Sequence, residues 1–484
     1  MAERKAVIGT VSMAAGNLLK LGLQFVYLPV LARLLDPASF GIVALAMPFI
    51  LLASMISDAG LGNALIRHSS PSRELESTVF WISILLGVVL AAIVSLAAWP
   101  VAHWMAQPKL AAIMVALTAV LPICGALSVA NARISRTQRF SLFAIGDLAA
   151  TVISSCVAIA AAFAGMGPWS LVVQQFVFWT VKGVWLIPNS GFRPKLVFTP
   201  SLTLPDLGYG LNAAGSNLFD FATKNAPTMI IGGMLGVIVL GHYAMANQII
   251  RVPDLLISGP IYLSVFTAVA QNDRSAMNQT ALFLRGLRGL VTVLAPIFCG
   301  LSFAAQPVIQ LLFGAKWAAT APILALLTPC GLLLCLYSFA GAIFMGVGRS
   351  DHQLKLSVLL CVLLIGGTLF GAPYGGSGVA LGLGVGATLA APFYVETLAR
   401  ELHLSKSAIV KEVAPPLIAT AAMALALSIV TRIDVSETWI HLSTMVVCGM
   451  VAYLTTLAAI SWRRLEEDVQ WLLSSKPDAG IEVP

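Results

Sequence analysis

Charged residues are scarce in this chain of 484 residues, because Asp, Glu, Lys and Arg make up only 10% of it while 58% is hydrophobic. A soluble domain carries about 25% charged residues, which hydrate its surface. The composition therefore excludes a soluble enzyme, a disordered chain and a nucleic-acid-binding protein. The net charge of +7 is therefore interpreted through the positions of the basic residues relative to a membrane, not as a sign of a nucleic-acid partner.

Patterns typical of disulfides, metal sites and nucleotide loops are also lacking. The seven Cys lie in apolar stretches without C-x-x-C spacing, and the six His show no ligand pattern, so buried free thiols are expected. The glycines of Gly382-Leu-Gly384-Val-Gly386 lie within an apolar span and indicate close helix packing. There is no Walker sequence and no Ser/His/Asp constellation. We expect no metal site, no catalytic residue and no cofactor.

Long apolar runs are abundant instead. A membrane-spanning helix needs roughly 20 mostly apolar residues, and fourteen segments qualify. Their predicted limits are 8–31, 40–66, 78–100, 110–131, 142–164, 168–188, 207–234, 239–263, 281–304, 320–347, 354–373, 376–399, 409–430 and 438–461. Prolines at positions 100, 168, 205, 307, 322 and 415 are predicted to mark span ends, because proline cannot continue a helical hydrogen-bond ladder. The sequence predicts an all-α polytopic membrane protein with fourteen transmembrane helices.

Basic residues predict the orientation of these spans. Twenty of the 28 Lys and Arg residues precede the first span or follow an even-numbered span, four follow odd-numbered spans, and four lie within spans. Cytoplasmic loops carry the excess of Lys and Arg. Both termini are therefore predicted to be cytoplasmic.

A weak internal repeat appears when the sequence is shifted by 200 positions. Asn17 then meets Asn217, and Gly41 meets Gly241, so span 1 aligns with span 7 and span 2 with span 8. Parallel repeats of this kind are a transporter architecture with a central site. The predicted division is a six-helix lobe in 1–200, a pseudo-symmetric six-helix lobe in 201–405, two additional helices in 406–461, and a cytoplasmic tail in 462–484. A short amphipathic helix or a solvated segment fits the tail.

Charges deep in the membrane are costly, at ~2.5–3.5 kcal/mol on insertion scales, and therefore indicate function. Six remain after Asp147, Lys182, Glu396 and Arg400 are set aside as lying near predicted cytoplasmic ends, where the long side chain of Lys182 can reach the headgroups. They are Lys20 in span 1, Asp58 in span 2, Asp220 and Lys224 in span 7, and Arg251 and Asp254 in span 8. Helical spacing aligns them with asparagine, glutamine or serine in four polar stripes, which predicts one shared polar cavity.

The candidate residues fall into three groups. The substrate-binding candidates are Asn17, Lys20, Gln24, Asn217, Lys224, Asn247 and Arg251. The candidates for ion coupling are Asp58, Asp220 and Asp254, because a carboxylate in a low-dielectric cavity readily binds a proton or cation. Arg33 and Arg67 are candidates for the two mouths. As alternatives, Asp220 with Lys224 and Arg251 with Asp254 form structural ion pairs, and Arg67 is an ordinary loop arginine.

Two segments resemble landmarks of a known family. They are Arg33-Leu-Leu-Asp-Pro-Ala-Ser-Phe-Gly41-Ile-Val-Ala and Ser57-Asp58-Ala-Gly60-Leu-Gly62-Asn-Ala-Leu-Ile-Arg67. Both are similar to bacterial polysaccharide exporters of the Wzx type, within the multidrug/oligosaccharidyl-lipid/polysaccharide exporter superfamily. The colanic-acid and xanthan exporter subgroup is the most similar. The likeness runs along essentially the whole chain.

The resemblance implies an alternating-access flippase in the bacterial inner membrane. Its substrate would be an undecaprenyl-diphosphate-linked oligosaccharide, moved to the periplasmic leaflet for exopolysaccharide or O-antigen synthesis. Lys20, Lys224 and Arg251 would neutralise the diphosphate, while the Asn and Gln candidates would bind sugar hydroxyls. An ion gradient or the membrane potential would drive transport, with proton or sodium coupling. Membrane lipids, a polysaccharide polymerase and export machinery are the implied partners, without nucleic acid.

Two alternatives stay open. A multidrug exporter of the same superfamily exports cations, for which the mixed charge of the stripes also serves. A membrane polysaccharide polymerase or glycosyltransferase is the other alternative, but it needs a sizeable periplasmic loop with catalytic residues. The predicted outer loops are short, which favours a transporter over such an enzyme.

Overall fold

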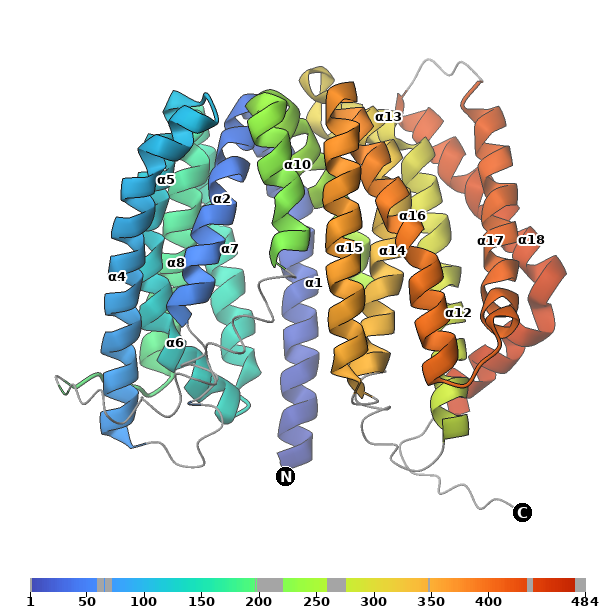
Figure 1. Cartoon of the computed structure of the whole chain (residues 1–484), viewed down its shortest axis with the longest axis horizontal. Coiled ribbons are helices and arrows are strands. Elements are labelled where there is room, and N and C mark those ends of the chain that lie inside the picture. Colours follow the sequence, from blue (N-terminus) through green and yellow to red (C-terminus); the bar gives the residue numbers. More distant parts are fainter. Residues whose placement is uncertain are drawn as a thin grey trace. The chain divides into compact units, whose positions relative to one another are not determined.

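The computed structural model (Figure 1) describes the backbone of residues 2–58, 65, 72–195, 197, 221–258, 276–346, 349–432 and 438–474. Side chains are described in these ranges except at 2–15, 58, 257–258, 276–279, 281–282, 350 and 462–474. All regular secondary structure in this part of the chain is helical.

The α-helices are α1 (Ala2–Leu34), α2 (Pro37–Asp58), α4 (Arg73–Trp104), α5 (Pro108–Thr118), α6 (Val120–Arg136), α7 (Phe140–Phe163), α8 (Trp169–Asn189), α10 (Gly236–Pro253), α12 (Ala276–Phe303), α13 (Ala305–Phe313), α14 (Thr320–Gly346), α15 (Ser350–Gly371), α16 (Gly375–Glu401), α17 (Lys406–Val430) and α18 (Thr438–Ser474). Short turns are η2 (Asp254–Ser258), η3 (Ala315–Trp317) and η4 (Ala372–Tyr374). Residues 221–234 are also helical.

The predicted class, an all-helical polytopic membrane protein, is confirmed. Within the described residues, ten helical stretches are long and apolar enough to cross a membrane, and the stretch Asp351–Glu401 contains both α15 and α16. Each of the fourteen predicted spans overlaps helix. The count of fourteen remains a prediction, because parts of the seventh and eighth spans, residues 207–220 and 259–263, lie outside the described residues.

The prolines do not mark helix ends as uniformly as predicted. Pro100 lies inside α4, which continues to Trp104, and Pro415 lies inside α17. Pro168 does precede the first residue of α8. A membrane helix tolerates an internal proline where neighbouring groups satisfy the freed carbonyl, so proline alone is a weak boundary signal in such a chain.

Two further details differ from the sequence prediction. The last predicted span and the tail helix form one element, α18, which bends at Ser461 where the backbone leaves helical geometry (φ −138°, ψ 26°). All seven cysteines are free, but Cys156 is exposed on α7 rather than buried. A small sulfur side chain is apolar enough to face lipid as well as a core.

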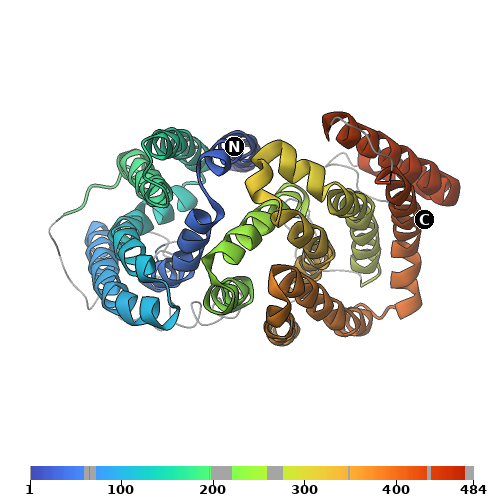
Figure 2. The same ribbon diagram turned by 90° about the horizontal axis from the view of Figure 1, so that it is seen from above.

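Two compact units make up the chain. One comprises 1–245, 312–317 and 368–379, and the other comprises 246–311, 318–367 and 380–484. Figure 2 shows the helices of the two units from above, some end-on and others inclined. The predicted lobes, 1–200 and 201–405, and the appended helices remain a prediction.

In the first unit, α7 packs against α1 and α8, while α4 packs against α2, α5 and α6. Short hydroxyl side chains allow close contact, since Ser128 Oγ donates to Ser83 Oγ at 3.2 Å in the core. Ser57 Oγ donates to the Ser83 carbonyl at 3.4 Å. Such bonds satisfy buried polar groups that water cannot reach in a membrane.

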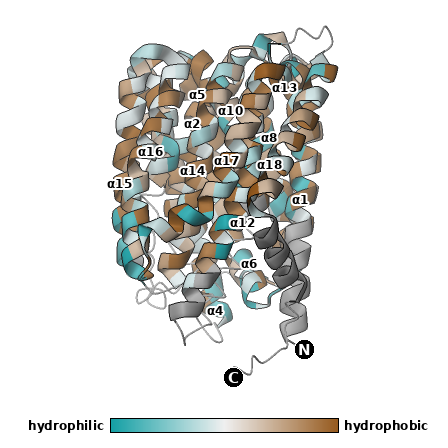
Figure 3. Ribbon diagram, turned by 90° about the vertical axis from the view of Figure 1, so that its right-hand side faces the viewer, coloured by the Kyte–Doolittle hydropathy of each residue, from teal (hydrophilic) through white to brown (hydrophobic). Residues whose placement is uncertain are grey.

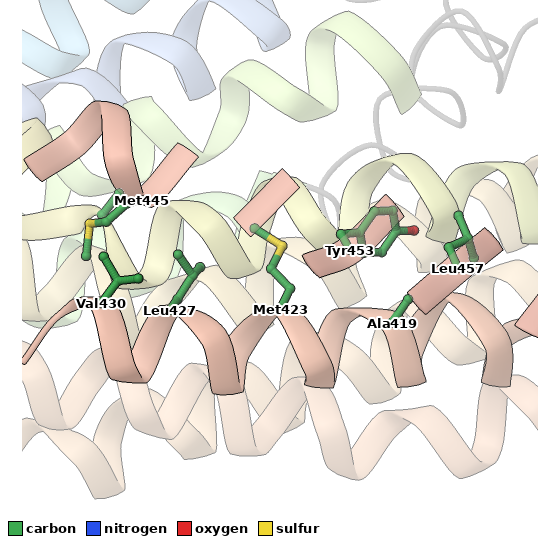
Figure 4. Close-up of a cluster of buried hydrophobic side chains, with 8 residues drawn as sticks. Ala419, Met423, Leu427, Val430, Met445, Tyr453 and Leu457 are labelled. Carbon is green, nitrogen blue, oxygen red and sulfur yellow. The ribbon is translucent and has the colours of Figure 1, made fainter. Parts of the chain in front are cut away.

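In the second unit, α12 packs against α14, α17 and α18. Figure 4 shows the apolar cluster that joins α17 to α18, in which Met423, Leu427 and Met445 are buried. Tyr453 of α18 also donates from its hydroxyl to the Thr292 carbonyl of α12 at 2.7 Å. Apolar colour runs along the helices of both units in Figure 3, as expected for surfaces that face lipid.

The glycine run in α16 serves helix packing, as predicted. A Cβ added at Gly382 would lie 2.0 Å from the Gly367 carbonyl oxygen of α15, and one at Gly386 would lie 2.5 Å from the Leu363 carbonyl oxygen. Residues without a side chain let two helices approach this closely.

Candidate substrate site

The three residues of the first predicted polar stripe, Asn17, Lys20 and Gln24, lie on α1. Asn17 is exposed, and Lys20 and Gln24 are half-buried. α1 packs against α7, which brings α7 residues next to the stripe. The stripe therefore belongs to a helix with a polar neighbour rather than to an isolated lipid-facing span.

A charged cluster links three helices at this place. Lys182 Nζ of α8 lies 2.7 Å from Asp147 Oδ1 of α7, and Lys20 Nζ of α1 lies 3.7 Å from Asp147 Oδ2. Asp147 is seven residues from the start of α7 and Lys182 seven residues from the end of α8, so both lie about 10 Å from the same end of this hairpin. Two cations share one carboxylate, and the cluster keeps a net positive charge.

Aromatic rings border the two ammonium groups. Lys20 Nζ lies 5.3 Å from the centroid of the Phe178 ring, and Lys182 Nζ lies 5.6 Å from that of Trp179. Cations at these distances are attracted to the ring face. A pair of lysines held beside aromatic rings is suited chemically to binding an anionic group.

Asp147, Lys182 and the two rings were missed as site residues from the sequence. Asp147 and Lys182 had been set aside because lysine near a helix end can extend to the headgroups. The sequence did contain a usable indication. Asp147 and Lys182 lie equally far from the adjacent ends of two consecutive antiparallel spans, so their opposite charges lie at the same depth in the membrane.

Three of the described candidates, Asn247, Arg251 and Asp254, lie in the second unit. Arg251 is exposed near the end of α10, and Asn247 is half-buried one turn earlier. Asp254 begins the π-helical turn η2, and its Oδ1 accepts a hydrogen bond from the Cys335 thiol of α14 at 3.5 Å. Among the described residues, Arg251 and Asp254 form no ion pair, so the structural pairing considered for them is not present.

For four candidate residues the structure gives no side-chain position. Asn217, Asp220 and Arg67 lie outside the described residues, as does the side chain of Asp58. Lys224 is described and exposed, in the first unit. The pairing of Asp220 with Lys224 and the single shared cavity remain predictions.

Arg33 lies at the exposed end of α1 and is fixed there. Its Nε donates to the Leu312 carbonyl at 3.3 Å, and its own carbonyl accepts from Lys316 Nζ at 2.6 Å. The buried Trp317 donates from Nε1 to the Ala32 carbonyl at 2.7 Å. The turn between α1 and α2 is therefore bound to residues 312–317 of the same unit.

Asp36 caps the first turn of α2. Asp36 Oδ1 accepts a hydrogen bond from the Ser39 amide at 2.9 Å, which satisfies a free donor at the helix start. Partial burial raises the pKa of Asp36, but the bonds from Ser39 and the charge of Lys316 outweigh it and leave the pKa below its usual value.

Repeat-related glycines touch each other in this unit. A Cβ added at Gly41 of α2 would lie 1.7 Å from the Val237 carbonyl oxygen, and one at Gly241 of α10 would lie 1.9 Å from the Pro37 carbonyl oxygen. Positions 37 and 237 differ by 200, as do 41 and 241. Reciprocal contacts of this kind arise around a local two-fold axis, which supports the repeat at this crossing.

These features define the class of the protein: a multi-pass, all-helical membrane protein with ionised side chains held between its helices. The same fold occurs in a solved structure of the lipid II flippase MurJ, with a TM-score of 0.76 at 14% identity over 95% of this chain and 99% of that one. An inward-facing multidrug resistance MATE transporter matches with a TM-score of 0.62 at 17% identity, over 82% of this chain and 99% of that one.

The chain belongs to the family described as polysaccharide biosynthesis protein, whose sequence profile matches residues 30–322. It is 27% identical to the succinoglycan biosynthesis transport protein ExoT of Rhizobium meliloti, over 72% of this chain and 71% of that protein. It is 25% identical to the lipopolysaccharide biosynthesis protein WzxC of Escherichia coli, over 78% of each. The predicted family is confirmed.

Proposed function

We propose that this protein is a flippase that moves undecaprenyl-diphosphate-linked oligosaccharide repeat units from the cytoplasmic to the periplasmic leaflet, for exopolysaccharide or O-antigen synthesis. Its family and the name of a relative, a transport protein for succinoglycan biosynthesis, support this assignment. Its fold is one that a lipid II flippase also has. The observation that carries it is the cluster of Lys20, Asp147 and Lys182 within the helices of the first unit.

The charge of this cluster discriminates between the candidate cargoes. Two ammonium groups and one carboxylate leave a net positive charge, which attracts an anion and repels a cationic drug. A diphosphate is strongly anionic and does not cross the hydrocarbon core alone, because moving charge out of water is costly. Lysine neutralises such a group as a compact point charge.

The remaining groups of the substrate have candidate partners on α1. Asn17 and Gln24 flank Lys20 on one helical face, and their amides can donate to and accept from sugar hydroxyls. The polyprenyl chain would stay in the lipid while the head group crosses. Lys224 in the first unit, and Asn247 and Arg251 in the second, are further candidates for contact with the substrate.

The proposal extends to topology and energy. Both termini lie in the cytoplasm by the distribution of basic residues, and the protein lies in the bacterial inner membrane. An ion gradient or the membrane potential drives the cycle, with Asp58, Asp220 or Asp254 binding a proton or sodium. The protein makes and breaks no covalent bond and needs no cofactor. A polysaccharide polymerase and export machinery receive the product.

Reconstitution tests the proposal. Proteoliposomes would carry a fluorescent undecaprenyl-diphosphate-linked oligosaccharide, and an impermeant glycosidase would measure the fraction in the outer leaflet. We expect wild type to equilibrate the lipid between leaflets, and Lys20→Gln to do so about tenfold more slowly, the effect of one lost charge-assisted contact.

Lys109→Gln is the matched control, because Lys109 is exposed at the start of α5 and lies far from the cluster in sequence. Its rate should equal that of wild type. Equal rates in wild-type and protein-free vesicles would refute the proposal. Efflux of a cationic dye from the same vesicles, without movement of the lipid, would indicate a multidrug exporter instead.

A further inference from the structure

The two lysines of the cluster are already neutralised in part by Asp147. The Lys182 contact is short at 2.7 Å and the Lys20 contact longer at 3.7 Å. The side chains of Lys20, Asp147 and Lys182 are 37%, 28% and 16% exposed. An incoming anion can therefore reach the lysines, but it must compete with a carboxylate that is attached to the protein.

Attachment gives Asp147 an advantage over small competitors. A tethered group acts at a high effective concentration, which a freely diffusing group of the same charge must exceed. An ordinary anionic phospholipid offers a phosphate diester with one negative charge, the same charge as the carboxylate. A diphosphate carries more charge on two adjacent groups, so it can contact both lysines at once.

The aromatic rings fix the lysines once the carboxylate is displaced. Phe178 lies within cation–π distance of both ammonium groups, at 5.3 Å from Lys20 Nζ and 5.9 Å from Lys182 Nζ. Trp179 supplies a second ring to Lys182 at 5.6 Å. These contacts do not involve Asp147, so the ammonium groups keep partners while they bind another anion.

We infer that Asp147 is a tethered counter-anion that makes the Lys20–Lys182 pair selective for a lipid diphosphate over the monoanionic headgroups of bulk phospholipids. The inference rests on the proposed function and deepens it, because it gives the substrate site a means of rejecting the abundant lipids around it. Asp147 acts here as a positioning residue and does not itself contact the substrate.

The test measures binding of undecaprenyl diphosphate to the full-length protein in nanodiscs of phosphatidylcholine, with and without phosphatidylglycerol. We expect the wild-type Kd to change by less than about twofold when phosphatidylglycerol is added. In Asp147→Asn, phosphatidylglycerol should raise the Kd about tenfold, because the lysines then bind the competing headgroup. A role confined to stability predicts no such lipid dependence.

Three further variants complete the design. Asp147→Glu retains the charge and should restore the wild-type response, while Asp147→Ser is a second neutral variant in case asparagine impairs folding. Glu74→Gln removes an exposed carboxylate from the start of α4 in the same unit and should behave as wild type. Thermal unfolding of each variant would establish that it is folded.

The outcomes separate the two levels of the argument. If wild type binds undecaprenyl diphosphate but both neutral Asp147 variants ignore phosphatidylglycerol, the inference is wrong and the proposed function stands. If Asp147→Glu responds to phosphatidylglycerol as the neutral variants do, the inference is also wrong. If wild type binds the diphosphate lipid in neither membrane, the proposed function itself fails.

Discussion

Substituting Gly41 by alanine tests the closest helix contact in the first unit. The added Cβ would lie 1.7 Å from the Val237 carbonyl oxygen and 2.8 Å from the Gly241 amide nitrogen. Both obstructing atoms belong to the α10 backbone, so no side-chain rotation relieves the clash. The two helices must move apart.

The size of this movement sets the expected cost. Ordinary van der Waals contacts begin near 3.4 Å, so the backbones must separate by about 1.7 Å at the crossing. Forcing extra atoms into a packed interior typically costs about 1–3 kcal/mol, and an obstacle made of backbone places Gly41→Ala near the upper limit. Gly241→Ala should cost a similar amount, since its Cβ would lie 1.9 Å from the Pro37 carbonyl oxygen.

Thermal unfolding of the purified protein in detergent is a suitable assay, with the flipping rate as a second measurement. Gly22→Ala is the matched control, because nothing lies within 4 Å of its added Cβ and alanine in a helix interior is about 0.5–1 kcal/mol more favourable than glycine. The Gly41/Gly241 double variant should lose less than the sum of the single losses, because one separation relieves both clashes. A Gly41→Ala protein as stable as wild type would refute the reasoning.

Three other substitutions probe single contacts, two of them described above and one, between Arg288 and Glu412, in the second unit. Trp317→Phe removes the donor to the Ala32 carbonyl, which leaves a buried acceptor unpaired and should cost about 1–3 kcal/mol in thermal unfolding. Arg288→Met breaks the 2.8 Å contact between Arg288 Nη1 of α12 and Glu412 Oε2 of α17. Limited proteolysis should then detect looser packing of α17. Adding Glu412→Gln to this variant should restore part of the lost stability against unfolding. Asp36→Ala should cost about 1 kcal/mol as a lost helix cap. The pKa of the Asp36 carboxyl is lowered in the folded state. The stabilisation that its charge provides is therefore complete above the unfolded pKa of about 3.9 and is lost as the pH falls through the lower folded pKa. The thermal unfolding curves of wild type and Asp36→Ala should converge in strong acid.

Much of the fold could be predicted from local properties of the chain. A run of about 20 apolar residues must form a helix in lipid, because the backbone has no water to bond. The stretch between Arg73 and Trp104 shows this, because it is a 32-residue helix long and apolar enough to cross a membrane. Details that depend on neighbouring helices, such as the passage of α4 through Pro100, could not be predicted in the same way.

Only part of the candidate site could be predicted from the sequence. The position of Lys20 inside a predicted apolar span identified it as a deep cation, because a charge is costly there. Its partner Asp147 lies 127 positions away and becomes a neighbour only because α1 packs beside α7. No periodicity in either helix specifies that pairing.

The amino-acid sequence by itself determined that this is a helical membrane protein of a polysaccharide biosynthesis family, since hydropathy, charge distribution and family motifs are all written along the chain. The tertiary structure decided which charges meet and which glycines touch. Gly41 and Gly241 were aligned by the repeat, but their contact required two helices to cross at that point. The physical reason is that burial in lipid acts on each helix separately, whereas ion pairs and van der Waals contacts act only over a few ångströms between helices.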